Sequence, residues 1–73
     1  MWNLIFIIAS LTSTDYVQYV DGVYESKVEC VSVIEELAAN VREDTTLVIV
    51  ADDFSHVYAT NEAYKVDMLC KEV

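Results

Sequence analysis

One segment of this chain has both a helix start signal and a helical period, and it reads S-K-V-E-C-V-S-V-I-E-E-L-A-A-N-V at Ser26–Val41. Ser26 and Glu29 match the capping box, in which the serine oxygen accepts the N–H of Glu29 and the carboxylate accepts that of Ser26. Apolar residues then recur at spacings of three and four, which lines one face of a helix: Cys30, Val33, Ile34, Leu37, Ala38 and Val41. The sequence predicts one helix at about 26–41.

The segments on either side of this helix favour strands. Trp2–Ala9 and Thr46–Ala51 are apolar at nearly every position, which is typical of central strands. Tyr16–Val20 alternates after a polar turn at Leu11–Asp15. Asp21-Gly22 then predicts a tight hairpin turn, because glycine adopts the positive φ that such turns require.

A second hairpin is predicted within Phe54–Cys70, turning at Asn61-Glu62. In that register the apolar pairs share one face and the polar pairs share the other. The apolar pairs are Val57 with Val66 and Ala59 with Tyr64, and the polar pairs are His56 with Asp67 and Tyr58 with Lys65.

Together the segments predict a single small domain at 1–73 with an α+β fold. It is a four- to five-stranded, mainly antiparallel sheet with one helix, at about 26–41, packed on one face. The other face would carry apolar groups of Trp2–Ala9 and Thr46–Ala51, joined by Val17 and Tyr19. Soluble monomers rarely expose such a patch. We therefore expect a homodimer through the uncovered sheet face.

The charge balance restricts the class of partner. Thirteen acidic residues against four basic ones give a net charge of −9. This opposes direct nucleic-acid binding, which needs a basic surface, and favours a protein partner with a basic surface. No apolar run approaches the ~20 residues of a membrane-spanning helix. The hydrophobic content of 55% excludes a disordered acidic tail.

The two cysteines of the chain could form a disulfide or remain reduced. Cys30 lies on the apolar face of the predicted helix and Cys70 on the apolar face of the last predicted strand, so both point into one core. A disulfide would close a loop of about 40 residues and contribute roughly 4 kcal/mol. The alternative is a pair of reduced, buried thiols, as expected in a cytosol. We expect no metal site, because the chain has no C-x-x-C motif and one histidine.

No catalytic set emerges from the sequence. Asp52-Asp53 follows an apolar strand, but neighbouring strand residues point to opposite sides, so a strand-ending turn is favoured over a carboxylate site. His56 opposite Asp67 has the form of a general base with an orienting carboxylate, yet no nucleophile adjoins it. We interpret it as an ordinary cross-strand pair, and we expect neither enzymatic activity nor a cofactor.

Three short motifs carry a resemblance to known proteins: M-W-x-L-I-F at Met1–Phe6, E-S-K-V-E-C at Glu25–Cys30 and L-C-K-E at Leu69–Glu72. In this layout the chain resembles small uncharacterised proteins of tailed bacteriophages. The resemblance implies a phage accessory protein that binds and inhibits a host factor, with the host cytoplasm as its location. It carries no functional residues over.

The expected function is that of a non-enzymatic acidic protein-binding module. Its contact surface is expected along the helix and its exit, at Glu29, Glu35, Glu36, Glu43 and Asp44. The five tyrosines agree with an interaction protein, because tyrosine offers rigid amphipathic area. The alternative function is a small structural or virion-associated homo-oligomer, which would have no host partner.

Overall fold

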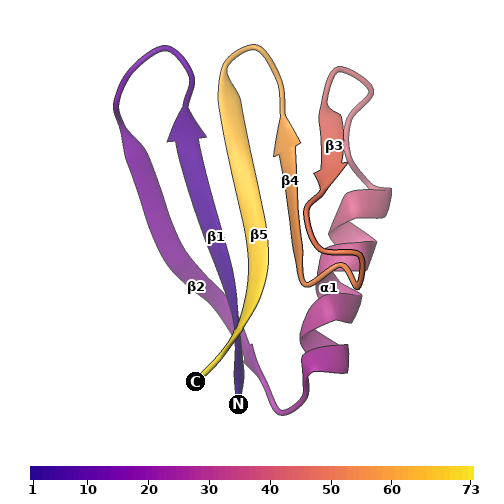
Figure 1. Cartoon of the computed structure of the whole chain (residues 1–73). Coiled ribbons are helices and arrows are strands. Elements are labelled where there is room, and N and C mark those ends of the chain that lie inside the picture. Colours follow the sequence, from indigo (N-terminus) through magenta and orange to yellow (C-terminus); the bar gives the residue numbers. More distant parts are fainter.

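The computed structural model describes all residues, Met1–Val73, and it has the predicted α+β fold. Five strands form one antiparallel sheet in the order β2-β1-β5-β4-β3, and one helix packs against it (Figure 1). The elements are β1 (Trp2–Ser10), β2 (Tyr16–Tyr24), α1 (Lys27–Ala39), β3 (Thr46–Ile49), β4 (His56–Thr60) and β5 (Tyr64–Glu72).

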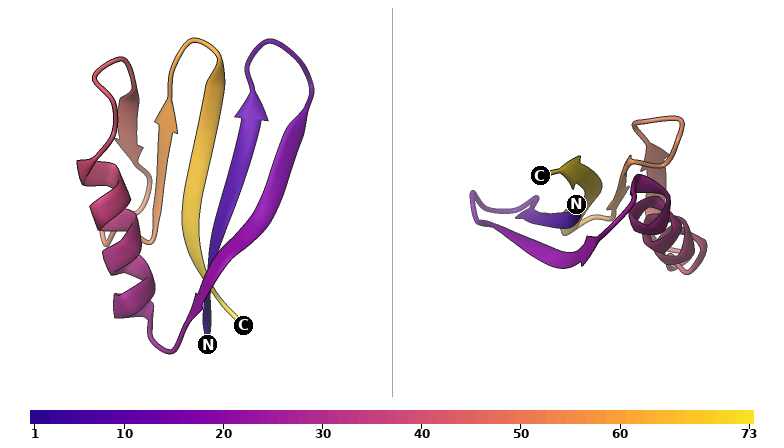
Figure 2. Two further views of the ribbon diagram at one scale, coloured as in Figure 1. Left: turned by 180° about the vertical axis from the view of Figure 1, so that it is seen from behind. Right: turned by 90° about the horizontal axis from the view of Figure 1, so that it is seen from below.

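The centre of the sheet is built from the two ends of the chain. β1 pairs with β5 from Trp2↔Glu72 to Ser10↔Tyr64, so both termini lie at the same end of the sheet (Figure 1). The helix lies on one side of the sheet near that end, toward β4 and β3 (Figure 2). A 13-residue helix is about 20 Å long and a nine-residue strand about 30 Å, so the β1–β2 hairpin extends past the helix.

The helix begins as predicted and ends slightly earlier. The Glu29 N–H donates to Ser26 Oγ at 3.2 Å, whereas the Glu29 carboxylate accepts the N–H of Glu25 at 3.3 Å, one residue before the expected donor. The helix ends at Ala39 rather than near Val41. Asn40 terminates it, since its side-chain amide donates to the Glu36 carbonyl at 2.8 Å and its N–H donates to the Leu37 carbonyl.

The core is small, and a disulfide runs through it. Five residues are buried: Leu4, Cys30, Ile34, Val57 and Met68. Cys30 and Cys70 are bonded, with 6.1 Å between their Cα atoms, so the oxidised alternative holds in this structure. Of the predicted apolar helix face, Cys30 and Ile34 are fully buried, but Leu37 remains 40% exposed. The helix therefore meets the sheet over a narrower stripe than predicted.

The prediction of a hairpin at Asp21-Gly22 was wrong. β2 continues through both residues to Tyr24, and the turn between β1 and β2 lies at Leu11–Asp15, closed by the Ser10 N–H donating to the Asp15 carbonyl at 3.0 Å. The pairing shifts by one residue between Leu4↔Gly22 and Ile5↔Val20, which makes a β-bulge. Gly22 has no positive φ. A Cβ there would lie 2.8 Å from the Tyr24 hydroxyl, so a larger residue at this position would require the Tyr24 side chain to move.

The second apolar run does not form a central strand. β3 is an edge strand whose one neighbour is β4. It ends at Ile49, because the N–H groups of Val50 and Ala51 both donate to the His56 carbonyl at 3.0 Å and the chain then turns away. Phe54 adopts a positive φ of 64° in that turn.

The predicted β4–β5 register was also wrong, by two residues. Val57 pairs with Met68 and Ala59 with Val66, so the turn is longer than Asn61-Glu62 alone. Asn61 Oδ1 closes it by accepting the N–H groups of Ala63 and Tyr64 at 2.8 and 2.9 Å. A shift of two residues preserves the facing of every side chain. The division into an apolar and a polar face was therefore right.

The side of the sheet opposite the helix is less apolar than predicted. Phe6 and Tyr19 pair on the helix side, with ring centroids 5.5 Å apart, so Tyr19 and Val17 do not face away from the helix as expected. On the opposite side Ile5 and Leu69 pair beside the polar residues Asp67 and His56. The predicted apolar patch is therefore interrupted by charge.

Removal of the disulfide tests how far the small core depends on it. The bond joins residues 40 positions apart, so the Cys30→Ala/Cys70→Ala variant should lose about 4 kcal/mol of unfolding free energy. Domains of this size have only about 4 to 11 kcal/mol in total. Urea unfolding followed by circular dichroism measures the change. A reductant should shift the parent protein similarly and leave the variant unchanged, and a parent midpoint insensitive to reduction contradicts the prediction.

Candidate functional site: the outer side of the helix

The five carboxylates named from the sequence lie along one exposed surface, which we call the acidic surface. Glu29, Glu35 and Glu36 project from α1, whereas Glu43 and Asp44 follow in the connection to β3, and all five are exposed. Glu29 and Glu36 are seven residues apart, so they lie on the same side of the helix, about 10 Å apart along its axis. Glu35 is rotated toward β3. The five residues are thus exposed along the helix and its exit, but Glu35 lies about 100° around the helix from Glu36 and no contact joins the five into one patch.

The five carboxylates differ in how far the protein itself uses them. Glu29 accepts the N–H of Glu25 at the start of the helix, and Asp44 lies 3.5 Å from Arg42 Nε. Glu35, Glu36 and Glu43 make neither a side-chain hydrogen bond nor an ion pair. These three remain free to bind a partner.

Most cationic side chains of the protein already pair with one carboxylate each, so they do not neutralise the remaining acidic residues. Three of the four cationic side chains contact carboxylates. Lys27 lies 2.7 Å from Asp53, Arg42 lies beside Asp44, and Lys65 lies 3.8 Å from Asp67. The acidic surface therefore keeps its negative potential.

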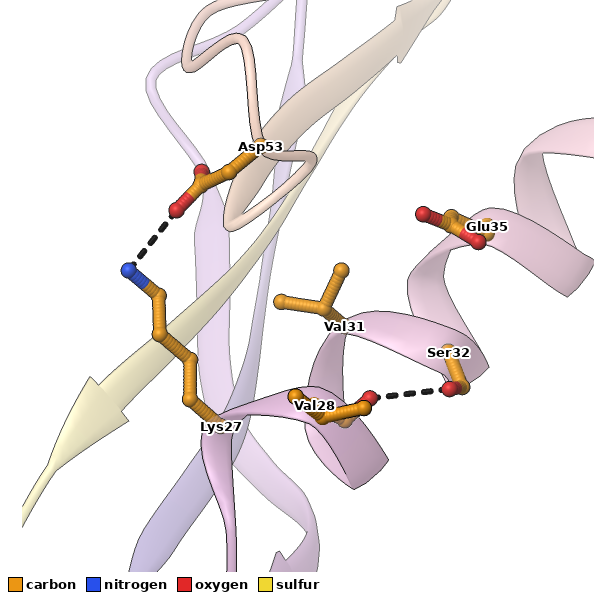
Figure 3. Close-up of a pocket in the computed structure, with 6 residues that line it drawn as sticks. All are labelled: Lys27, Val28, Val31, Ser32, Glu35 and Asp53. Atoms are coloured by element: carbon orange, nitrogen blue, oxygen red, sulfur yellow. Dashed lines mark hydrogen bonds and ion pairs between the residues drawn. The ribbon is translucent and has the colours of Figure 1, made fainter.

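A shallow depression adjoins this surface, with a volume of about 320 Å³ (Figure 3). Its lining comes from the first half of the helix and the β3–β4 loop: Lys27, Val28, Val31, Ser32, Glu35 and Asp53. Val28, in the first turn of the helix, is 76% exposed. The Val31 side chain points toward the Lys27–Asp53 pair (Figure 3). The depression thus combines an apolar floor with charged walls.

The Lys27–Asp53 ion pair forms one wall of the depression. The Lys27 ammonium and the hydroxyl and N–H of Ser55 hold the pKa of Asp53 far below its usual value of 3.8. Asp53 Oδ1 accepts the Ser55 N–H at 3.0 Å, so the carboxylate is also part of the turn. Lys27 in addition lies 5.6 Å from the Trp2 ring centroid. These contacts fix both charges in place.

Sequence reasoning missed three of these residues. Val28 does not belong to the apolar positions that the spacing places on one face of the helix, and this was the one signal of its exposure. Asp53 was correctly interpreted as part of a strand-ending turn, but nothing in the sequence shows that the turn folds back onto the helix. Lys27 carries no signal of its own in the sequence, because its partner Asp53 comes from a distant loop.

The His56–Asp67 pair lies on the opposite side of the sheet from the helix. His56 Nε2 and Asp67 Oδ1 are 2.8 Å apart, joining residues that are diagonal rather than directly opposite. Lys65 contacts the same carboxylate, and its ammonium lies 4.3 Å from the Tyr58 ring centroid. No group of three or more His, Cys, Asp or Glu side chains could hold a metal ion. We interpret the cluster as a network that is satisfied by its own contacts.

The lowered pKa of Asp53 predicts how stability depends on pH. A depressed pKa stabilises the fold above the unfolded value, and this contribution is lost as pH falls below it. Asp53→Asn should therefore lower the urea midpoint at pH 7, and the gap to the parent should narrow below pH 3.8, its usual value. Asp52→Asn, next to it and exposed, is the matched control. An Asp53→Asn gap that stays constant down to pH 2 contradicts the assignment.

Comparison with known proteins gives no relative for this chain: no family model, no curated protein and no solved structure matches it. The one helix has 13 residues, and no helix of the structure has the length and apolarity to cross a membrane.

Proposed function

We propose that this protein is a non-enzymatic acidic module that binds a protein with a basic surface through the acidic surface of α1. The observation that carries the proposal is Val28, which is 76% exposed in a depression that is also lined by Glu35, a carboxylate paired with no cation of the protein. Protein interfaces commonly have an apolar centre inside a polar rim. The outer side of α1 supplies both.

The depression beside Val28 indicates what the partner would insert. Lysine and arginine carry a long aliphatic stem and a charged head. The stem can lie over Val28 and Val31, and the head can then reach Glu35, whose carboxylate has no other partner. Arginine is favoured over lysine, because its planar head binds a carboxylate through two hydrogen bonds. Glu36 and Glu43 extend the surface for further basic residues.

The net charge of −9 supports fast and salt-sensitive association with such a partner. Complementary charge raises the association rate more than the final affinity. Added salt screens charges over about 8 Å at physiological ionic strength. Binding should accordingly weaken as salt is raised, mainly through the association rate.

The sequence resemblance to small tailed-bacteriophage proteins supports a more specific form of the proposal. In that form the partner is a host factor, met in the host cytoplasm and inhibited by the bound protein. The alternative, a structural or virion-associated homo-oligomer, differs in having no host partner. Capture from a host lysate discriminates the two.

Charge reversal tests the acidic surface directly. The immobilised protein should retain a partner from a bacterial lysate, and Glu35→Lys/Glu36→Lys/Glu43→Lys should abolish the capture by repelling its basic residues. Glu29 and Asp44 are left intact, because Glu29 caps the helix and Asp44 pairs with Arg42. The matched control is Asp15→Lys/Asp52→Lys/Glu72→Lys, which makes the same change in charge at exposed positions elsewhere.

With the captured partner in hand, Val28→Ala separates the apolar centre from the charges. It should raise the dissociation constant about tenfold, or about 1.4 kcal/mol, measured by calorimetry. Equal capture by both triple variants rejects the acidic surface as the contact. Loss of capture in both reduces the proposal to an effect of net charge. An unchanged dissociation constant for Val28→Ala removes the depression from the interface.

A further inference from the structure

The single helix leaves part of its own side of the sheet uncovered. Strands lie about 4.8 Å apart and a helix is about 10 Å wide, so a five-stranded sheet has room for two helices on one side. α1 lies toward β3 and β4, whereas the β1–β2 hairpin and the start of β5 extend past it (Figure 2, left). The chain supplies no helix for this second place.

The uncovered area is apolar, and we call it the apolar shelf. Residues paired across antiparallel strands point to the same side of the sheet, and the shelf comprises those on the helix side past α1: Phe6, Ile8, Val17, Tyr19, Tyr64 and Val66. Val17, Tyr19 and Tyr64 are 59%, 40% and 53% exposed, and none of the six is charged. The opposite side of the sheet differs, because β5 carries Lys65 and Asp67 there.

One flank of α1 forms a wall of the shelf. The depression at Val28 is also lined by Asp53 of the β3–β4 loop, so that flank of the helix faces β3. Each residue turns a helix by about 100°, so Leu37, nine residues after Val28, lies on the opposite flank, toward the shelf. Val33, one turn before Leu37, shares this flank. Leu37 is 40% exposed and therefore adds an apolar side chain to the border of the shelf.

Carboxylates border the shelf at two places. Glu36 lies next to Leu37, farther from the sheet on the same flank of α1. At the far end, Asp15 lines a second depression of about 270 Å³, whose lining includes the shelf residues Ile8, Val17 and Tyr64. Neither Glu36 nor Asp15 forms an ion pair within the protein. An apolar area with such borders is complementary to an apolar face bordered by lysine and arginine.

We propose that the apolar shelf binds an amphipathic helix of a partner protein, whose apolar face is flanked by lysine and arginine. The bound helix lies beside α1 as the second helix on this side of the sheet. A helix of three turns is about 16 Å long, close to the ~14 Å from Phe6 to Ser10 along β1. Its apolar face covers the shelf and Leu37, and its basic flanks reach Glu36 and Asp15.

Charge favours this partner over a second copy of the chain. Each copy has a net charge of −9, and two shelves facing each other would bring the carboxylates at their borders together. The helix of a second copy is also unsuitable, because the outer side of α1 carries Glu29 and Glu36 instead of basic residues. A basic amphipathic helix meets neither difficulty.

The contact is small, so we expect weak binding. Stable complexes bury about 1,200–2,000 Å² in total, and a helix of three turns buries less. A free helix of this length is also mostly unfolded in water, so part of the binding free energy is used to fold it. The expected dissociation constant is about 10–100 µM, in the range of weak and transient complexes.

A synthetic peptide serves as the probe for the shelf. It has about 14 residues, with leucine at positions i, i+3, i+4 and i+7 and lysine or arginine on both flanks. Calorimetry at physiological salt should give the expected dissociation constant, and a peptide that does not bind overturns the proposal. A peptide of the same composition, in an order without an apolar face, should bind at least tenfold more weakly, because only charge attraction then remains.

Two lysine substitutions in β2 separate the shelf from the rest of the surface. Val17→Lys places a cation on the shelf and should raise the dissociation constant of the peptide at least tenfold. Val23→Lys is the matched control, since Val23 is 54% exposed on the opposite side of the same strand and the added charge is equal. Val28→Ala alters the outer side of α1, on which the proposed function depends, and should leave peptide binding unchanged.

Amide chemical shifts measured by NMR locate the bound peptide. The largest changes should fall on Val17 and Leu37. Largest changes at Val28 and Glu35 overturn the shelf and leave the proposed function intact. Equal binding of the two peptides, or equal weakening by Val17→Lys and Val23→Lys, overturns the proposal because charge alone then explains the affinity. So does a parent protein that dimerises in sedimentation equilibrium and becomes monomeric with Val17→Lys, since a second copy then covers the shelf.

Discussion

The disulfide between Cys30 and Cys70 is the contact on which the position of the helix depends. Only Cys30 and Ile34 of α1 are fully buried, so few side chains anchor it to the sheet. The bond joins Cys30, in the first half of the helix, to Cys70 in β5, the middle strand of the sheet. Everything proposed for the outer side of the helix relies on this anchor.

The features that the sequence predicted correctly are those determined by local chemistry. The hydroxyl of Ser26 and the apolar spacing after it define the helix, because both act within a few residues. The strand at Trp2–Ala9 was predicted from composition alone and is found one residue longer. Asp21-Gly22 misled because the same glycine that permits a tight turn also permits a bulge.

The positions of segments that are far apart in the sequence were harder to predict. The apolar run at Thr46–Ala51 is typical of a central strand. In the structure its last two residues, Val50 and Ala51, instead donate their N–H groups to the His56 carbonyl, and β3 is an edge strand. Glu29, Glu35 and Glu36 were predicted to be exposed because helical spacing places them outside the apolar face. The place of Asp53 beside Lys27 was not predicted, since it depends on the path of a loop across the molecule. The residues that one helix contributes to a candidate site can thus be predicted from the sequence, but those that a second, distant segment contributes cannot.

The pairing of β1 with β5 imposes an order on folding during synthesis. β1 is the first strand made and β5 the last, and their partnership runs from Trp2↔Glu72 to Ser10↔Tyr64. On the ribosome β1 can pair only with β2, and its other edge stays open until nearly all of these residues have emerged. The disulfide of Cys30 likewise cannot form until Cys70 has emerged. The nascent chain is therefore a hairpin followed by a helix without a core, and the sheet closes as a late, non-local event, as in slowly folding proteins of high contact order.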